Sequence, residues 1–341
     1  MEALYTYLRE HPVAYVTRDR ERAEGLPFGS PGYSIFANEN GSQNNKSTRE
    51  LITEFTNPDN ASILVFKPTK SVEQICRERN WRLLNPSAEL AYQVENKVTQ
   101  VRWLGELARY LPEHWLGELI ECNVTRPFVL QFATGHSGEG TFLIESEQDL
   151  ANHIKQFPRR LIRASRLITG QTYTNNNVVT SDSVLIGNIS LQITGEPVLT
   201  NNRFATVGND WGLANSKLTN QDKLAYNKIA RDIGEKLRES GWKGLFGIDV
   251  IKEERTNRMY LIEINARQPA SACFESSIQD QARKAGFRES LPFVGIRAQM
   301  LTTFEAHLAS LLRLPLTNNQ LIPITSGRRE INRLVKSEAR L

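Results

Sequence analysis

Two apolar segments joined by a short polar turn, at residues 245–265, constrain the fold of this chain more than any other feature. Leu245–Lys252 and Arg258–Asn265 have the length and composition of buried strands, and Glu253–Asn257 between them is polar. Two such runs around a short polar link predict an antiparallel hairpin.

The register of this hairpin places acidic side chains together. If the turn is symmetric about Thr256, Asp249 lies directly opposite Glu263, with Cβ atoms about 4.5–5.5 Å apart. Side chains two apart on a strand share a face, so Asn265 joins Glu263. The hairpin therefore predicts two carboxylates and one amide on one patch, among apolar neighbours: Ile248, Val250, Ile262 and Ile264.

Two adjacent carboxylates repel each other, so such a pair is costly to hold without a cation. An all-oxygen cluster suits a hard ion, and Mg²⁺ commonly takes one or two carboxylates and completes its shell with water and substrate phosphates. Asp249, Glu263 and Asn265 are therefore candidate metal ligands in a metal–nucleotide site. An exposed sheet face that simply carries acidic residues is the alternative.

The first 95 residues alternate strands with helices, which predicts a small parallel sheet. Ser71 is the expected N-cap of its helix, because Glu73 and Gln74 follow in the first turn. The expected elements are strands at Val13–Thr17, Ser62–Phe66 and Trp81–Leu84, helices at Ser47–Phe55 and Ser71–Asn80, and a loop at Gly25–Gln43.

Residues from about 96 onward divide into two further regions, 96–180 and 181–341. In the long helix that begins at Thr219, Thr219 and Asp222 form an expected capping box, and Leu224, Ile229, Ile233 and Leu237 recur at helical spacing. The expected helices are Lys97–Tyr110, Glu147–Gln156 after Ser146, Thr219–Ser240, and an amphipathic outer helix at Leu301–Arg313. The expected strands are Phe128–Ala133, Thr141–Ile144, Leu161–Ser165, Ser183–Ile193 and Pro197–Leu199.

A glycine-rich loop, Thr134–Thr141, lies between two of these strands. Its three glycines and two hydroxyl residues allow backbone N–H groups to approach an anion, although a plain hairpin turn has the same composition. Lys97 opens its expected helix, where an ammonium is unfavourable unless an anion is near. Taken alone, Lys97 is better explained as a solvated lysine.

Composition excludes several classes of protein. The charged fraction of 23% and hydrophobic fraction of 40% are those of a folded globular chain, and no apolar run approaches the length of about 20 residues that spans a membrane. The start of the chain carries charges too early for a signal peptide, so a cytoplasmic location is expected. Three cysteines with no CxxC spacing predict buried thiols rather than disulfides or zinc.

The net charge of +4 is small, and no nucleic-acid partner is expected. The late basic cluster is interpreted as a solvated helical face rather than a nucleic-acid patch, because no reader motif accompanies it. Its residues are Arg328, Arg329, Arg333, Lys336 and Arg340.

Taken together and in this order, these segments resemble the ATP-grasp superfamily. The likeness is sharpest at GIDVIKEERTNRMYLIEINARQPAS, good at RPFVLQFATGHSGEGTFLIES and moderate at PSAELAYQVENK. The resemblance implies an α/β (α+β) fold with an N-terminal α/β domain (1–95), a small lid (96–180) and a larger metal-binding domain (181–341).

The resemblance also implies roles for individual residues. Asp249, Glu263 and Asn265 would bind two Mg²⁺ ions, or Mn²⁺ in their place. Arg267, with Arg203, would stabilise the anionic intermediate, and the loop after Asn201 would line the acceptor site. The implied nucleotide-binding residues are Lys97, Gln131, Ser137, Gly138, Gly140, Thr141, Ser165, Arg166, Leu167 and Ile168.

Three positions depart from the family pattern. Gln131 stands where a second phosphate-binding lysine is usual, with Arg163 or Arg166 as candidate replacements for its charge. Ser165 stands where the hinge usually has a glutamate, and Gln171 and Thr172 stand where a ribose-binding acid is usual.

The resemblance implies ligation of a carboxylate to an amine, such as amino acids or a peptide, through an acyl-phosphate made from ATP. Dimers are common among relatives, so the resemblance leaves a homodimer open, but the sequence itself does not indicate an oligomeric state. The alternatives are a kinase of a small hydroxyl substrate and a nucleotide-binding module without catalysis.

Overall fold

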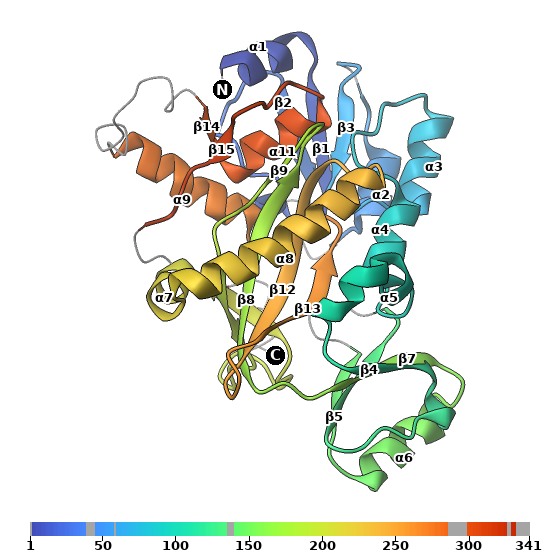
Figure 1. Cartoon of the computed structure of the whole chain (residues 1–341). Helices are drawn as coiled ribbons and strands as arrows, with labels where there is room; N and C mark the ends of the chain where they lie inside the picture. Colours follow the sequence, from blue (N-terminus) through green and yellow to red (C-terminus); the bar gives the residue numbers. More distant parts are fainter. Residues whose placement is uncertain are drawn as a thin grey trace.

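The computed structural model describes residues 2–38, 45–57, 59–134, 140–285, 299–325 and 329–331. Within them, three main sheets follow one another along the chain, and the mixed α/β fold that was expected is confirmed. Figure 1 shows the N-terminal sheet and the four-stranded sheet at opposite ends of the molecule, with the large sheet between them.

The N-terminal sheet has the order β2-β1-β3, and its strands are parallel, as expected. Helices α2 and α3 pack beside it, and the side chain of Asn85 pairs with both backbone groups of Val65. The elements are α1 (Glu2–Glu10), β1 (Val13–Thr17), the 3₁₀ turn η1 (Arg20–Arg22), β2 (Tyr33–Ala37), α2 (Thr48–Glu54), β3 (Ser62–Val65) and α3 (Lys70–Glu78).

Three expectations for this region are wrong in detail. The N-cap of α3 is Thr69, whose hydroxyl accepts from Val72 N at 3.2 Å, so the helix starts before Ser71. Trp81–Leu84 makes a single bridge, from Leu83 to Ile63, because Asn85 takes over the pairing of β3. The expected loop Gly25–Gln43 contains the strand β2, which pairs along its whole length with β1.

The lid is a four-stranded antiparallel sheet in the order β4-β7-β5-β6. Helix α6 begins after Ser146, as expected, and Ser146 and Asp149 form a capping box in which each side chain accepts from the other's backbone N–H. The elements are β4 (His114–Glu118), the 3₁₀ turn η3 (Leu119–Glu121), β5 (Phe128–Phe132), β6 (Thr141–Ile144), α6 (Glu147–Gln156) and β7 (Leu161–Arg166).

One short helix and a 3₁₀ turn take the place of the single helix that was expected at Lys97–Tyr110, and a further helix precedes them. Gly105 has φ +57°, a left-handed conformation that divides the expected helix Lys97–Tyr110. The elements here are α4 (Ala88–Glu95), α5 (Thr99–Leu104) and the 3₁₀ turn η2 (Gly105–Tyr110).

The large sheet runs in the order β13-β12-β8-β10-β11-β16, with β9 paired to β8. Of its strands, β8, β11 and β16 were not expected from the sequence. Arg329, interpreted from the sequence as part of a helical face, lies in β16, so that interpretation is wrong at this residue. Pro197–Leu199 is not a strand because Leu199 N closes a turn onto Glu196 O. The strands are β8 (Gly170–Val179), β9 (Val184–Leu185), β10 (Ser190–Thr194), β11 (Thr206–Asp210), β12 (Gly244–Glu253), β13 (Met259–Asn265) and β16 (Arg329–Ile331).

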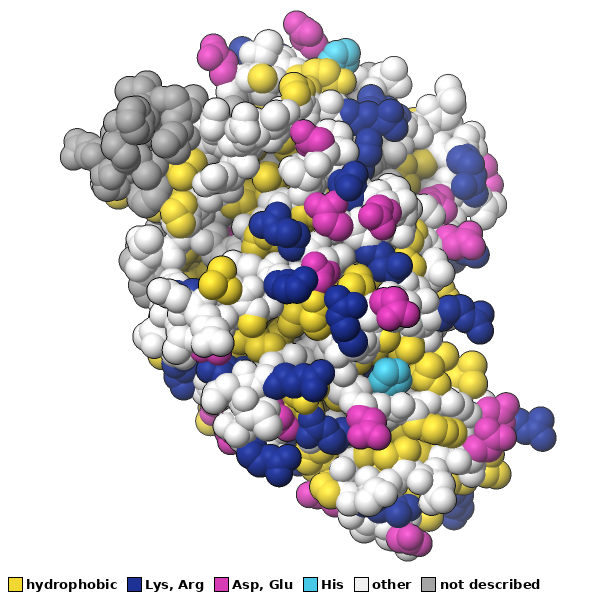
Figure 2. Space-filling model, in the orientation of Figure 1, with side chains coloured by type: hydrophobic (Ala, Val, Ile, Leu, Met, Phe, Trp, Pro, Cys, Tyr) yellow, Lys and Arg dark blue, Asp and Glu magenta, His cyan; other side chains and the backbone are white. Residues whose placement is uncertain are grey.

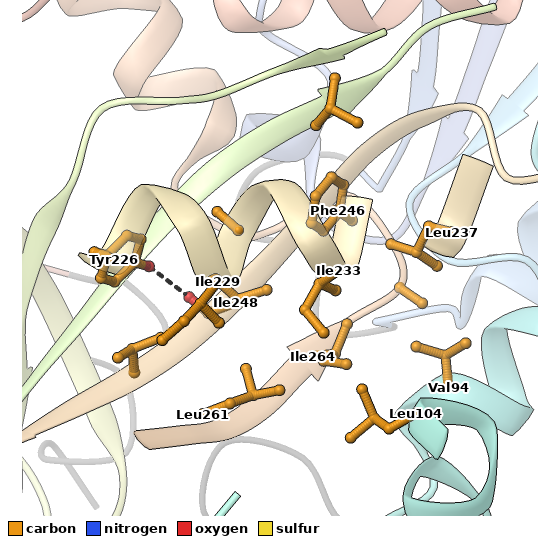
Figure 3. Close-up of a cluster of buried hydrophobic side chains, with 14 of the residues drawn as sticks. Val94, Leu104, Tyr226, Ile229, Ile233, Leu237, Phe246, Ile248, Leu261 and Ile264 are labelled. Carbon is orange, nitrogen blue, oxygen red and sulfur yellow. Dashed lines mark hydrogen bonds between the residues drawn. The ribbon is translucent and has the colours of Figure 1, made fainter. Parts of the chain in front are cut away.

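Helix α8 (Asn220–Glu239) covers one face of this sheet, and its expected capping box of Thr219 and Asp222 is confirmed. Figure 3 shows its apolar residues packed on those of β12 and β13. Leu224 is 71% exposed and lies outside this face, contrary to expectation. Elsewhere in this region lie α7 (Trp211–Lys217), α9 (Ala272–Lys284), α11 (Thr303–Leu311), β14 (Met300–Leu301) and β15 (Gln320–Leu321).

Helix α11 was expected on the outside, but every one of its residues is buried. It shares a core with α1, β1, β3 and the start of β12, so it joins the N-terminal sheet to the large sheet. Two of its polar side chains pair with backbone groups: Ser310 Oγ donates to Val179 O at 2.6 Å, and His307 Nδ1 accepts from Leu245 N at 3.0 Å. Buried polar groups are tolerated when they are hydrogen-bonded.

The three-part division of the chain remains a proposal. We place the end of the lid at the 167–169 link, because β8 begins at Gly170 and pairs with β12 in the large sheet. No helix among the described residues is both long and apolar enough to cross a bilayer. On the face seen in Figure 2, basic and acidic side chains are interspersed, as is typical of a solvated surface. All three cysteines are free and buried, as expected.

Candidate active site

The β12–β13 hairpin has the expected pairing at its acidic end. Asp249 lies opposite Glu263, and Gly247 lies opposite Asn265. A bulge after Asp249 shifts the register by one residue nearer the turn, where Val250 pairs with Leu261. The symmetric register is therefore right where the acidic residues lie and wrong beyond the bulge.

Alternation along the strands separates the acidic patch from the core. Ile248 and Ile264 face α8 in the apolar cluster (Figure 3), and Val250 belongs to the same cluster. Asp249 and Glu263 lie on the opposite face, where Asn265 Nδ2 is 3.5 Å from Asp249 Oδ2. The structure thus brings the three predicted metal ligands together.

Asp249 is buried in a way that disfavours its charge. Burial and the negative charge of the neighbouring Glu263 raise the pKa of Asp249 to about 6. Hydrogen bonds from Thr174 and Gln192 lower this pKa, but their effect is smaller. Its Oδ1 atom is buried and has no hydrogen-bond partner among the described residues. A carboxylate oxygen left in this state can accept a cation.

Lys97 lies against the acidic pair. Its Nζ is 2.8 Å from Glu263 Oε1, and only 6% of its side chain is exposed. Burial alone would raise the pKa of Glu263, but the positive charges of Lys97, Arg267 and Arg163 outweigh it and the pKa is lowered. Lys97 precedes α5 rather than opening a helix, and its backbone N–H donates to Ala133 O at 2.8 Å, beside the glycine-rich loop.

Arg267 links the acidic patch to the N-terminal sheet. Its Nη1 donates to Asn265 Oδ1 and, at 3.0 Å, to Glu95 Oε1. Glu95 also pairs with Lys67, which follows β3, at 2.5 Å. Sequence analysis assigned no role to Glu95 or Lys67, because this ion chain depends on how separate segments pack.

Gln131 lies opposite Arg163 in the lid sheet. The Arg163 guanidinium donates to Gln131 Oε1 at 2.8 and 3.1 Å, to Gln100 Oε1 at 3.1 Å and to Ile262 O at 2.9 Å. Burial lowers the pKa of Arg163 to about 10, with Glu263 opposing the change. A fully buried arginine thus joins the lid sheet, α5 and strand β13 of the β12–β13 hairpin.

The glycine-rich loop is described only at its edges, and the predicted residues Ser137 and Gly138 lie outside the described residues. Gly140 has φ +75°, a conformation that favours glycine, and its carbonyl accepts from Phe132 N at 2.8 Å. Thr141 follows as the first residue of β6 and pairs with Gln131.

The predicted hinge residues lie where the lid meets the large sheet. Ser165 and Arg166 end β7, and Leu167 and Ile168 lie in the link to β8. Arg166 contacts the tip of the metal hairpin, because it donates to Glu253 Oε1 and to Tyr260 OH, both at 2.8 Å. This side chain therefore ties the hinge to the hairpin.

Arg203 is not brought to the acidic patch by any contact among the described residues. It is exposed in the turn between β10 and β11, and its guanidinium lies 5.6 Å from the ring centroid of Phe204. Its predicted role remains untested.

Thr174 was missed in the sequence because β8 was missed, and Gln192, on β10, was missed because the pairing of β10 with β8 was not foreseen. Thr174 lies on β8 directly opposite Asp249. The three consecutive asparagines Asn175–Asn177 made a strand here look improbable in the sequence, since asparagine is depleted in strands. Thr174 lies beside the acidic pair only because β8 pairs with β12, and a sequence pattern does not reveal that pairing.

Comparison with known proteins bears on this geometry. A model of the ATP-grasp domain matches residues 94–271, more than half of the chain, whereas no curated protein matches. The fold is similar to that of N5-carboxyaminoimidazole synthase from Aspergillus clavatus, solved with ADP and 5-aminoimidazole ribonucleotide. That match has a TM-score of 0.64 and 16% identity, and covers 95% of this chain and 82% of the other.

Two other solved structures share the fold. Phosphoribosylamine–glycine ligase from Thermotoga maritima matches with a TM-score of 0.64 and 13% identity, over 94% of this chain and 79% of the other. An L-amino acid ligase from Bacillus licheniformis matches with a TM-score of 0.57 and 12% identity, over 89% and 74%.

Proposed function

Because this chain belongs to the ATP-grasp domain family, we propose that it is an ATP- and magnesium-dependent ligase that joins a carboxylate to an amine through an acyl-phosphate. The observation that carries the proposal is the convergence of Asp249, Glu263 and Asn265 on one face of the hairpin, with Lys97 bonded to Glu263. The two ligases named above have a similar fold.

The residues present fit a magnesium ion. They offer only oxygen donors, and the buried Oδ1 of Asp249 lacks a partner in the described part of the chain. No group of three or more His, Cys, Asp or Glu side chains suited to a metal occurs among the described residues, so an all-protein cage is not indicated there. Mg²⁺ bound through two carboxylates and an amide would draw its other ligands from water and nucleotide phosphates and neutralise their charge.

The chain's own residues would position the nucleotide. Lys97 would exchange its contact with Glu263 for a phosphate oxygen, since an ammonium binds either anion. Gly140 and Thr141 would place backbone N–H groups near the phosphates. The 165–168 hinge would hold the base, and Arg163 would supply the positive charge that Gln131 lacks.

In the proposed reaction, a carboxylate oxygen of the first substrate attacks the γ-phosphorus and ADP leaves. The amine then attacks the acyl carbon and phosphate leaves, which gives an amide. Arg267, which lies beside Asn265, would stabilise the oxyanion of the tetrahedral intermediate. Closure of the lid would keep water from the acyl-phosphate.

A screen of amino-acid pairs with Mg-ATP tests the proposal. Amine-dependent ADP formation with release of free phosphate is expected, because both products leave in the two steps above. Amine-independent ADP formation with a phosphorylated product would indicate a kinase. Binding of Mg-ADP without turnover of any pair would indicate a nucleotide-binding module.

A further inference from the structure

The side chain of Arg22 is buried without a full set of partners. Arg22 lies in η1, just after β1, and 12% of its side chain is exposed. Its Nη1 is buried and has no hydrogen-bond partner among the described residues, and the nearest carboxylate oxygen belongs to Asp19, 3.9 Å from Nε. A buried charged donor left unsatisfied is costly. This side chain is therefore set up to receive an acceptor.

A second arginine shares its aromatic neighbour. The guanidinium of Arg22 lies 4.2 Å from the ring centroid of Phe66, and that of Arg267 lies 5.9 Å from the same centroid. Burial lowers the pKa of Arg22, with Asp19 opposing and the charge of Arg267 adding to the decrease. Two cations at one ring repel each other, and a bound anion would relieve that repulsion.

The carboxylates nearby do not satisfy this charge. Asp19 bonds Arg18 through two hydrogen bonds of 3.0 Å, so Arg22 has only its distant contact. Glu95 is likewise shared between Lys67 and Arg267. Asp19 and Glu95 are therefore each shared between two basic side chains.

The position of the group is that of a ligand site. Arg22 and Phe66 follow the carboxyl ends of the parallel strands β1 and β3, where open parallel sheets bind their ligands. Gln268, the residue after Arg267, fixes this arrangement. Its Nε2 donates to Arg22 O at 2.6 Å, and its Oε1 accepts from Tyr15 OH at 2.9 Å. The backbone of Arg22 is thus held to the segment that follows β13, while its Nη1 keeps no described partner.

We propose that Arg22, together with Arg267, binds a carboxylate or phosphate group of the substrate at the Phe66 ring. Arg267 would serve both ends of the substrate, because it bonds Asn265 beside the reacting centre and also lies near the Phe66 ring. The anion at Arg22 would be a second group, since the unpartnered Nη1 of Arg22 makes no described hydrogen bond to the acidic residues of β12 and β13. The substrate class is therefore a molecule with a second anionic group. That the anion belongs to the substrate rests on the proposed ligase function.

Binding of two simple probes tests the site. Inorganic phosphate and succinate are titrated by calorimetry into the wild-type protein and into Arg22→Gln, Arg22→Lys and Arg20→Gln. Arg20 is the matched control, because it lies in the same turn but is exposed and pairs with Glu24. The probe that binds more tightly tells whether the site prefers phosphate or carboxylate.

Arg22→Gln should weaken probe binding at least tenfold, because a charge-assisted hydrogen bond is lost. Arg22→Lys should give an intermediate loss, since an ammonium lacks the planar fork. Mg-ADP affinity should not fall, and the melting temperature should change little, because the variant loses only the contact with the Phe66 ring and the 3.9 Å ion pair with Asp19 while it removes a buried donor without a partner. Equal probe binding by wild type and Arg22→Gln, no binding by the wild type, or a large drop in melting temperature would overturn the proposal.

Turnover separates this inference from the proposed function. If ADP forms with an amine but kcat/KM for the best substrate is the same in Arg22→Gln, the ligase stands and the anion site fails. If no pair of substrates supports ADP formation while probe binding still depends on Arg22, the anion site stands and the ligase fails. Comparing kcat/KM of the wild type for aspartate with that for asparagine, and for glutamate with that for glutamine, shows whether it prefers the anionic member of each pair.

Discussion

Asp249 shows how one residue is tuned by its surroundings. It lies on a central part of the large sheet, where burial and Glu263 both disfavour its charge, and its pKa rises to about 6. The pKa of Glu263 is instead lowered, because the ammonium of Lys97 forms an ion pair with its carboxylate. One carboxylate of the pair is therefore stabilised by the protein itself, and the other is left for a ligand.

Asp249→Asn is expected to lower turnover at least a thousandfold without lowering stability. The amide keeps the shape but removes the negative charge that would hold the metal, and it also removes the repulsion with Glu263. Steady-state ADP formation and thermal unfolding check the two parts. Glu254→Gln, in the exposed turn of the same hairpin, is the matched control. Wild-type turnover in Asp249→Asn would remove the metal role.

Residue positions that depend on local pairing could be predicted from the sequence. A symmetric turn and the two-residue period were enough to place Asp249 opposite Glu263, since the bulge falls on the turn side of the pair. Contacts between distant segments were not accessible in this way. The pairing of Lys97 with Glu263 and the stacking of Arg22 on Phe66 follow from tertiary packing, which no local pattern encodes.

At the scale of elements, the lid is held to the rest of the chain by few polar contacts. Arg163 on β7 donates to Gln100 on α5 and to the carbonyl of Ile262 on β13. Arg166 at the end of the same strand reaches the tip of the hairpin through Glu253. The orientation of the lid sheet therefore depends on two arginines of one strand.

Arg163→Met should destabilise the protein by about 1–3 kcal/mol and loosen the lid, because several buried acceptors lose their donor. Urea unfolding measures the first effect, and hydrogen exchange of residues 114–166 measures the second. Mg-ADP affinity should fall as well if Arg163 supplies charge to the phosphates. Arg163→Lys keeps the charge but not the fork of donors, so it should restore nucleotide affinity better than lid protection. Unchanged exchange in Arg163→Met would show that the lid is held by other contacts.

Elements with a strong local signal were predicted well, and those defined by their neighbours were not. Helix α6 and strands β1 and β6 have the expected bounds, because capping residues and apolar runs mark them. Helix α11 was misplaced on the surface, since its polar residues suggested a solvated face, although Glu305, His307 and Ser310 are buried and hydrogen-bonded. Strand β8 was missed because its polar run gains its stability from pairing with β12 and β10.

At the scale of the whole molecule, two buried titratable groups lie where separate layers meet. Glu275 on α9 accepts from Asn176 Nδ2 of β8 at 2.5 Å and from Asn188 Nδ2 at 2.9 Å, and burial raises its pKa to about 7. His307 on α11 accepts from Leu245 N, and burial lowers its pKa to about 3. Both groups are therefore uncharged or nearly so at mildly acidic pH in the folded protein.

Their contributions to stability have opposite pH dependence. The pKa of Glu275 is raised from 4.5, so the folded protein binds this proton more tightly than the unfolded chain does. The resulting stabilisation is complete below pH 4.5 and is lost as pH rises through about 7. The pKa of His307 is lowered from 6.5, so its contribution is present above pH 6.5 and is lost progressively as pH falls toward 3. Between pH 4.5 and 6.5 the two slopes oppose each other.

Glu275→Gln should therefore expose the slope that belongs to His307. The amide keeps an acceptor for Asn188 but no longer takes up a proton, so the variant should lose stability more steeply than wild type between pH 7 and pH 5. At pH 8 it should be at least as stable as wild type, because no buried carboxylate is then ionised. Urea midpoints at pH 5, 6, 7 and 8 measure both effects, with Glu239→Gln at the exposed end of α8 as the control. Parallel pH profiles for Glu275→Gln and wild type would mean that Glu275 titrates alike in the folded and unfolded chains, and that the contact between α9 and β8 does not tune it.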